Sequence, residues 1–416
     1  MNSQRVFIVM VLFFSCFLCS HQCNSVETCS TLMPNGSGAR ALSMGGAFIA
    51  IANDATAASW NPAGIVQLGR PELSIIYAQT HRVENNHFQQ ISLFSGKQGI
   101  SNADINYFSL TYPFFILNRN ISLSLNYQNL YDLNREWSLE NKAKKIKYQL
   151  NGNIGAYGFV FSFRLIKNFS IGVTINFWKD WIDKNGWTEK QMDIFIYDEF
   201  EKTLKSAVDY DIDGINANIG MLWRLNENLT LGAVYKTPFN AELQKTMRNG
   251  SSSKVIIQDE TLEFPASYGI GVACQITEDF TLSADFYRTN WQHFIHRDSF
   301  GNSRSAITNE QVKDADVKAV NKICFGLEYR FPDYENNYEI PVRCGFFSDP
   351  APASHKTDKF WGISFGAGWV TDIHCIDIAY QFRWANQVRE YLVKGFGEFS
   401  QNVKEHSFYS SYVYHF

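Results

Sequence analysis

The sequence lacks the features that mark several common classes of protein. After the first 24 residues no stretch approaches the length of about 18 apolar residues that a membrane-spanning helix needs, which excludes a helical membrane protein. The formal net charge of -4 provides no basic field for nucleic acid. Eight cysteines are present, but their spacing does not resemble a zinc site, and no nucleophile motif indicates a lipase. We therefore expect no enzyme, no metal and no cofactor.

We expect residues 1–22 to be a secretory signal. Arg5 is the only early charge, and an apolar run over 6–19 leads into a polar stretch. Such a run is too short to span a membrane as a helix and is removed on export. Export would place Cys23 and Cys29 in an oxidising compartment, where they either form a disulfide or remain two thiols.

The last ten residues alternate an aromatic face with a more polar one. Phe408, Tyr412, Tyr414 and the terminal Phe416 share the aromatic face. A strand with one apolar face needs an apolar phase beside it, and lipid is the phase that a closing strand of an outer-membrane barrel meets. The edge strand of a soluble sandwich is the alternative. The high aromatic content, 15% of the chain, favours a barrel with aromatic girdles at both membrane interfaces.

Alternating segments and alternating connector lengths continue through the chain from residue 70. Short turns such as 165–168 and 225–228 alternate with long polar loops such as 180–211 and 291–320. This pattern predicts an all-β fold, a fourteen-stranded antiparallel transmembrane β-barrel over 70–416, inserted as a monomer in the outer membrane. The expected strands are 71–80, 104–112, 120–129, 154–164, 169–179, 212–224, 228–236, 266–275, 279–290, 321–331, 338–347, 361–370, 374–383 and 406–416.

Charged residues fall on the inward-facing set of several expected strands. They carry both signs on consecutive strands, so we favour a structural salt-bridge ladder over the alternative of a polar transport path. The residues are Asp285, Glu328, Arg330, Arg343, Asp377 and Arg383.

Small residues dominate the stretch before the first strand, which we assign as an N-terminal hatch over residues 23–69. Gly45 and Gly46 allow tight bends. We expect helices over 38–44 and 54–60, the second capped by Asn53 or Asp54 and ended by Asn61-Pro62. A segment of this size fits inside a barrel of fourteen strands.

Several stretches of the chain resemble one family in order. They are GARALSMGGAFIAIANDATAASWNPAGI (38–65), FPASYGIGVACQITEDFTLSADFYRTNWQHF (264–294), EIPVRCGFFSDP (339–350) and ISFGAGWVTDIHCIDIAYQFRW (363–384). The first resembles the hatch of the FadL-type long-chain fatty acid transporters, which include the TodX-type aromatic hydrocarbon channels. The resemblance implies a plugged, monomeric fourteen-stranded barrel. It also implies capture of a hydrophobic molecule among the extracellular loops, a pocket against the hatch, and lateral release through the wall.

Candidate functional residues follow from the resemblance and from the pattern of the loops. The hatch and gating candidates are Gly45, Gly46, Asn61, Pro62, Ala63 and Gly64. The ligand-binding candidates are Arg40, Phe48 and Trp60 in the hatch, and Phe195, Phe200 and Leu204 in an amphipathic helix expected over 189–207. That helix is either a capture surface or a lid. His293 and His296 have a helical metal spacing but no third ligand nearby.

Two functions remain open at this point. The first is a passive channel for hydrophobic compounds, with long-chain fatty acids as the leading cargo and hydrocarbons as the other. The second is a barrel of the same family that acts as a surface platform for protein secretion or attachment. The partners expected in both cases are outer-membrane lipid and, through the C-terminal strand, the barrel-assembly machinery; the first adds a hydrophobic small molecule.

Overall fold

The computed structural model describes most of the chain after the first 35 residues. The described ranges are 36–88, 96–116, 119–140, 144–182, 184–197, 200–249, 255–355, 357–388 and 399–416. The expected signal 1–22 and the Cys23–Cys29 pair lie outside them. No helix within these ranges is long and apolar enough to cross a bilayer.

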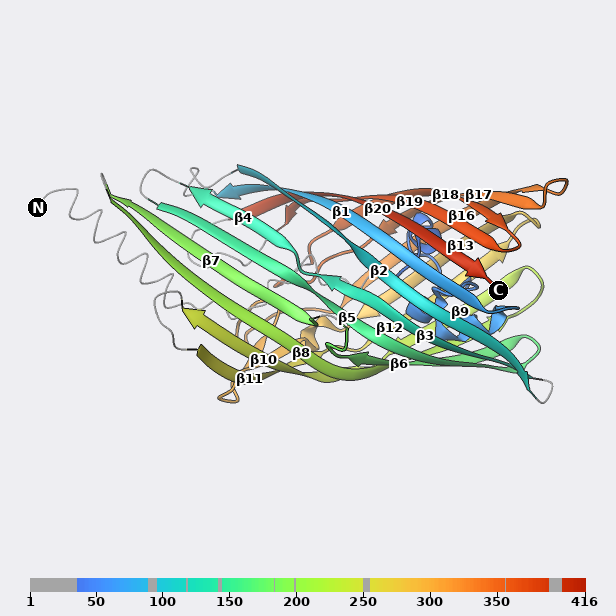
Figure 1. Ribbon diagram of the computed structural model, residues 1–416, viewed down its shortest axis with the longest axis horizontal. Helices are drawn as coiled ribbons and strands as arrows, with labels where there is room; N and C mark the ends of the chain where they lie inside the picture. Colours follow the sequence, from blue (N-terminus) through green and yellow to red (C-terminus); the bar gives the residue numbers. More distant parts are fainter. Residues whose placement is uncertain are drawn as a thin grey trace, which may run out of the picture.

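The wall of the molecule is a closed, antiparallel barrel of fourteen strands, as the sequence predicts (Figure 1). The first wall strand pairs with both the second and the last, which closes the sheet. The wall strands are β1 (Glu72–Phe88), β2 (Gly96–Ile116), β3 (Arg119–Asp132), β5 (Lys144–Ile166), β6 (Phe169–Trp178), β8 (Phe200–Arg224), β9 (Leu229–Lys236), β12 (Ser267–Gln275), β13 (Phe280–Thr289), β16 (Val320–Asp333), β17 (Tyr338–Ser348), β18 (Phe360–Thr371), β19 (His374–Val388) and β20 (Phe399–His415).

Side chains alternate between lipid and lumen along the wall, as the period of two requires. On β19, Ile376 and Ile378 are 44% and 60% exposed on the outside, whereas Asp377 between them is 3% exposed. The outside is therefore apolar because it faces hydrocarbon, and the inside is polar because it faces the hatch. Short turns lie at the end of the barrel where the Phe416 amide donates to the Pro71 carbonyl.

The opposite, extracellular end is taller than the sequence pattern predicts. The loops expected over 130–153, 180–211 and 237–265 contain paired strands that lengthen one side of the wall, at the left of Figure 1. We call these strands, with the upper parts of β5 and β8, the extracellular sheet. The additional elements are β4 (Arg135–Glu140), β7 (Gly186–Tyr197), β10 (Phe239–Asn249), β11 (Val255–Phe264), β14 (Ile295–Arg297), β15 (Ser303–Ser305) and the short helix η3 (Trp291–His293).

The amphipathic helix expected over 189–207 is wrong. This stretch forms a hairpin of β7 and β8, and β7 also pairs with β5 on its other edge. Two neighbouring strands supply backbone partners along its length, so the extended form prevails over a helical pattern of apolar residues that carries only a weak intrinsic preference.

The hatch lies inside the barrel, where its backbone contacts strands from all around the wall (Figure 1). It contains α2 (Ala39–Ser43), α3 (Ala57–Trp60) and the 3-10 helix η1 (Pro62–Gln67). Both α-helices are shorter than expected, and α3 has Thr56 at its N-cap position in place of Asn53 or Asp54. The Asp54 carboxylate instead accepts from the Thr56 amide and hydroxyl, 2.9 and 2.5 Å away.

Candidate functional site

Side chains of the hatch and wall satisfy each other's backbone groups. The Asn61 amide donates to the carbonyls of Ile49 and Met221, both at 2.9 Å, and so joins two parts of the hatch to β8. From the wall, the Asp285 carboxylate accepts from the amides of Phe48 and Ile49 at 2.7 and 2.8 Å. The irregular hatch backbone therefore has partners although it is buried.

Glycine lets the hatch approach the wall at one point. Gly45 and Gly46 have positive φ angles of 67° and 81°, which side chains with a Cβ rarely adopt. A Cβ added to Gly345 on β17 would lie 2.1 Å from the Gly45 nitrogen. The bend at Gly45-Gly46 can therefore lie directly against β17. Of the other gating candidates, Pro62 and Ala63 lie equally close to Gly172 and Gly220 of the wall, and Gly64 lies against Ala52.

A buried ionic cluster fixes α2 to the wall. Arg40 makes a bidentate contact with Glu328, with both N–O distances 2.9 Å. Arg343 lies between Glu328 and Asp377, with an N–O distance of 2.5 Å to each. Burial alone lowers the pKa of the Arg40 guanidinium, but the Glu328 carboxylate raises that pKa well above its ordinary value. We call these four residues the hatch lock.

The hatch lock continues to Asp54 at the periplasmic side of the hatch. Arg40 is 3.7 Å from Asp54, and it also donates to the Asn53 side chain at 2.7 Å. Burial raises the pKa of the Asp54 carboxyl, while Arg40 and the Thr56 hydrogen bonds oppose that rise. A polar recess of about 440 Å³ lies here, lined by charged residues that include Arg224 and Glu339.

The six expected lumenal charges occupy different places and do not form one ladder. Glu328, Arg343 and Asp377 belong to the hatch lock, and Asp285 holds the hatch backbone. Arg330 lies at the periplasmic rim, 3.7 Å from Glu339. Arg383 lies on the extracellular side of the hatch, where its guanidinium is 4.0 Å from the centre of the Phe360 ring.

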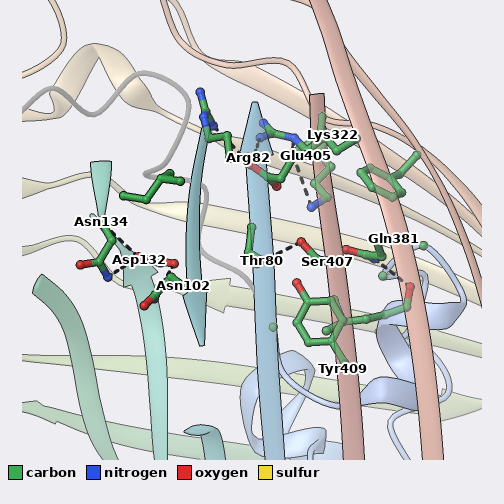
Figure 2. A pocket seen from close by; sticks show the side chains of 18 of the residues that line it. Thr80, Arg82, Asn102, Asp132, Asn134, Lys322, Gln381, Glu405, Ser407 and Tyr409 are labelled. Carbon is green, nitrogen blue, oxygen red and sulfur yellow. Dashed lines mark hydrogen bonds and ion pairs between the residues drawn. The ribbon is translucent and has the colours of Figure 1, made fainter. Parts of the chain in front are cut away.

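A pocket of about 90 Å³ lies directly above the hatch (Figure 2). Gly45, Gly46 and Trp60 of the hatch contribute to its lining. The other two hatch candidates for ligand binding are placed differently: Phe48 is fully buried, and Arg40 is engaged by Glu328. Of the three, only Trp60 borders the space that a ligand would enter.

Charged side chains run around the wall beside this pocket, and we call them the ionic belt. Arg82 lies 3.3 Å from Glu405, which lies 3.8 Å from Arg383; Figure 2 labels Arg82 and Glu405. Cations and carboxylates alternate along this belt of described residues. The members are Arg135, Glu84, Arg82, Glu405, Arg383, Asp349 and Lys322.

An aromatic cluster fills part of the lumen farther out. Trp178 packs against Phe239 and Phe264, with ring centres 4.8 and 5.3 Å apart. The cluster consists of Tyr131, Trp178, Phe239, Phe264, Trp291 and Phe294. Local sequence pattern does not bring these residues together, because they come from separate strands and the segment around one short helix. Which of these side chains face the lumen follows only from the additional strands of the extracellular sheet.

The loop candidates are also placed by the extracellular sheet. Phe195 lies on β7 and is buried, and Leu204 lies half-buried on β8. Phe200 begins β8. No helix brings the three together on one face.

Within the described residues, the pairing between the neighbouring wall strands β2 and β3 stops partway along their length. β2 pairs with β3 only from Ile116 up to Tyr107, which faces Gln128. Above that point, within the described residues, no backbone pairing joins β2 to β3 or β4. We call this interval, between β2 residues 96–106 and residues 129–140, the seam.

Polar side chains bridge the seam. Asn102 donates to Asp132 at 2.9 Å, and Asn153 donates to Asp104 at 3.1 Å. Asn134 donates to Asp132 as well, at 2.8 Å, and Figure 2 shows Asn102, Asp132 and Asn134 together at one side of the pocket. Gln98 also exchanges two hydrogen bonds of 3.0 Å with the Ser138 backbone across the seam. Such side-chain hydrogen bonds can separate without breaking a strand ladder.

The two histidines of the expected metal spacing do not act together. The His296 ring lies 2.8 Å from Glu260, which lies 3.5 Å from Lys245, all buried in the extracellular sheet. His293 lies on η3 and is exposed. Within the described ranges, no group of three or more His, Cys, Asp or Glu side chains is placed to hold a metal.

Known proteins share this architecture. The chain is 14% identical to a Pseudomonas aeruginosa FadL homologue, with a TM-score of 0.66 over 93% of this chain and 100% of that one. It is 14% identical to the Pseudomonas putida toluene transporter TodX, with a TM-score of 0.58 over 92% and 99%. It is 13% identical to the Ralstonia pickettii toluene transporter TbuX, with a TM-score of 0.53 over 92% of this chain and 99% of that one. At these identities the likeness shows the fold.

Sequence similarity shows the family. No curated protein matches the chain significantly. Residues 30–406, however, match the profile of the family described as outer membrane protein transport protein (OMPP1/FadL/TodX). That family comprises transporters of the outer membrane and is not an enzyme family. Because the profile covers most of the chain and the wall closes as a fourteen-stranded barrel, the chain belongs to the FadL/TodX family of outer-membrane transporters.

Proposed function

We propose that this protein is a passive outer-membrane channel for hydrophobic compounds, and that long-chain fatty acids are its cargo. One observation carries the proposal: the pocket above the hatch is bordered below by Gly45, Gly46 and Trp60 and reaches Asn102 and Asp132 at the seam. For a molecule in this pocket, the hatch blocks the path along the barrel axis, and the seam lies at its side. Its shortest way out is lateral.

The distribution of polarity supports a lateral route over an axial one. Below the hatch an apolar molecule would meet the recess lined by Arg224, Glu339 and other charged residues, and would have to displace the water that solvates them. At the seam it would meet lipid, because Ile105 on the outer face beside the lower end of the seam is 52% exposed. We infer that the cargo arrives through the aromatic cluster, rests above the hatch and leaves through the seam into the membrane. Its flow follows its gradient.

The ionic belt supports a fatty acid over a plain hydrocarbon. Arg82, Lys322 and Arg383 line the pocket beside Asp132, Asp349 and Glu405, so a ligand carboxylate would find guanidinium and ammonium groups within reach that keep it charged. The aromatic cluster above would hold the alkyl chain by apolar contact. Two similar structures carry the name toluene transporter, so an uncharged hydrocarbon is the competing cargo.

A crosslink across the seam tests the route. We expect the double variant Asn102→Cys/Asp132→Cys, crosslinked by a short bifunctional thiol-reactive reagent, to lose oleate uptake by cells at limiting supply. The control is Ser74→Cys with Ser109→Cys, which lie 3.2 Å apart across the intact β1–β2 ladder. That crosslink should leave uptake unchanged. Full uptake through a crosslinked seam would exclude the lateral route.

A competition experiment tests the cargo. Oleate should displace a fluorescent fatty acid from the purified protein, and Arg383→Gln should weaken oleate binding about tenfold while it leaves toluene binding unchanged. Equal weakening of both ligands would contradict recognition of a carboxylate. Unchanged oleate uptake in a deletion strain that has lost surface-attached proteins would instead support the surface platform.

A further inference from the structure

The outer face of the extracellular sheet carries a groove of about 400 Å³. Strand register places its lining in two adjacent rows. Lys147, Met192 and Lys205 face one another on β5, β7 and β8, and Gln149, Lys190 and Ala207 form the next row. Arg248 on β10 extends the second row beyond Ala207. We call this surface the basic groove.

The groove is strongly cationic. Lys147, Lys190, Lys205 and Arg248 line it together with a single carboxylate, Glu136. Arg248 forms an ion pair with Asp209 just below. Among the described residues, no carboxylate forms an ion pair with the three lysines. Three exposed ammonium groups on adjacent strands repel one another unless an anion lies between them.

The groove faces away from the channel. Side chains of β5 alternate, so Lys147 and Gln149 point to the same side as Phe159 and Phe161, which are each 42% exposed on the outer wall. The opposite face of the sheet carries the buried Trp187. The groove therefore faces the surroundings of the barrel and is separated from the transported molecule by the sheet.

Its height above the membrane identifies the partner. Lys147 is twelve residues from Phe159 along β5. At about 3.3 Å per residue and a tilt of 35–45°, the groove lies roughly 30 Å above Phe159. Phe159 lies seven residues from Ile166 at the periplasmic end of β5, roughly 18 Å up an apolar band about 25 Å tall, so the groove lies roughly 20 Å beyond the hydrocarbon. A phospholipid headgroup layer extends only about 5–8 Å on each side of a bilayer. The partner must be an anion that reaches much farther out while it remains beside the barrel.

We propose that the basic groove binds the phosphorylated saccharide headgroup of the glycolipid that forms the outer leaflet. Phosphate groups on the sugars would lie between Lys147, Lys190 and Lys205, as ammonium groups bind phosphate as compact point charges. Met192 between the lysine rows would contact the apolar face of a sugar ring. This contact would hold the tall side of the wall upright in the saccharide layer, independently of the cargo.

Binding of a defined glycolipid tests the proposal. The probe is rough-type lipopolysaccharide with a phosphorylated core, added to the full-length purified protein at low ionic strength. Lys147→Gln/Lys190→Gln/Lys205→Gln should weaken binding at least tenfold. Chemical removal of the core phosphates should weaken binding to the unmodified protein equally. Inorganic phosphate at matched ionic strength should not displace the probe.

A matched control changes three other exposed extracellular lysines. Lys313→Gln/Lys318→Gln/Lys359→Gln alters the net charge by the same amount and should leave binding within twofold. Equal losses in both triple variants would reduce the effect to general charge attraction and overturn the site. Full binding of the dephosphorylated probe would overturn phosphate recognition.

Two further measurements keep the outcome interpretable. If the groove triple variant does not fold, the single substitution Lys190→Glu in the centre of the groove should give the same loss, and full binding there would also overturn the proposal. Oleate uptake should be unchanged in the groove variants, because the groove lies outside the channel. A negative result for glycolipid binding therefore does not bear on the transport proposal, and a negative result for transport does not bear on glycolipid binding.

Discussion

The periplasmic half of the lumen is filled by the hatch through directional polar contacts, whereas part of the extracellular half is filled by aromatic side chains from two wall strands and the additional elements beyond them. In the lower half, Arg40 and Asn61 have fixed partners at hydrogen-bond distance. In the upper half, Trp178 and Phe264 make ring contacts without hydrogen bonds between them.

The difference separates two physical tasks. Hydrogen bonds and buried ion pairs depend on direction, so the lower half holds one arrangement. Apolar contacts have little directionality, so an alkyl chain can replace one ring contact by another at small cost. A channel for hydrophobic compounds needs both features: a hatch that closes the lumen below, and an apolar surface above that can adapt to different ligands.

The largest effect should come from Glu328→Gln in the hatch lock. Arg40 and Arg343 would each lose their shared carboxylate, and leaving buried charges incompletely paired costs about 3–5 kcal/mol. We expect a loosened hatch, measurable as new ion conductance in planar bilayers together with a lower unfolding midpoint. Glu339→Gln at the exposed rim should change stability by less than about 1 kcal/mol and leave conductance unchanged. Equal conductance of the two variants would contradict the proposal that the hatch lock keeps the hatch closed.

Phe264→Ala should disrupt packing of the aromatic cluster in the upper half and leave the hatch in the lower half closed. Phe264 is 5% exposed and contacts four rings, so its truncation should cost about 3–5 kcal/mol of stability. Affinity for an apolar ligand should fall by about tenfold, while planar-bilayer conductance stays at the wild-type level. Appearance of conductance would show that the two halves are not independent.

Asn61→Ala sharpens the contrast within the lower half. The substitution removes the side-chain amide that donates to the carbonyls of Ile49 and Met221, and loss of these two hydrogen bonds should cost about 1–3 kcal/mol. Asn126 is equally buried, yet its amide atoms have no hydrogen-bond partner among the described residues, so Asn126→Ala should change stability little. Chemical unfolding in detergent measures both. Similar losses would mean that burial, and not the bridging hydrogen bonds, determines the effect.

The smallest effect concerns pH in the extracellular sheet. Burial raises the pKa of Glu189 to about 8, although Trp187 and Lys245 act in the opposite direction. Since the pKa in the unfolded chain is about 4.3, the folded sheet binds the proton more tightly, and stability falls as pH rises from about 4 towards 8. At pH 9, amide exchange in β7 should be at least tenfold faster than in Glu189→Gln, a difference that shrinks as pH falls and is absent near pH 4. Identical exchange at both pH values would contradict the shift.

Local sequence pattern was sufficient to predict the wall where strands are regular. Alternation around Asp377 and around Glu328 predicted which side chains face the lumen, because a strand fixes that choice by a period of two. The same reasoning failed over 189–207. There the apolar residues fit a helix as well as a hairpin, and only the partners on β5 and β8 decide between them.

The candidate site was predicted in part. The small residues around Gly45 and Asn61 indicated a compact hatch, since close backbone approach needs small side chains. Nothing local indicated that Arg40 is engaged by Glu328, which lies 288 residues away in sequence. The seam was equally hidden, because a missing pairing between β2 and β3 is a property of two strand edges and not of either sequence.

The sequence by itself determined a closed fourteen-stranded barrel, its lipid-facing side chains and a small-residue segment ahead of it, because these depend on periodicity, length and composition. Tertiary structure alone decided which charges lock the hatch, which rings meet in the upper lumen and where the wall is unpaired. Those features depend on the register among strands that are distant in the chain, and register is fixed only when the whole barrel closes.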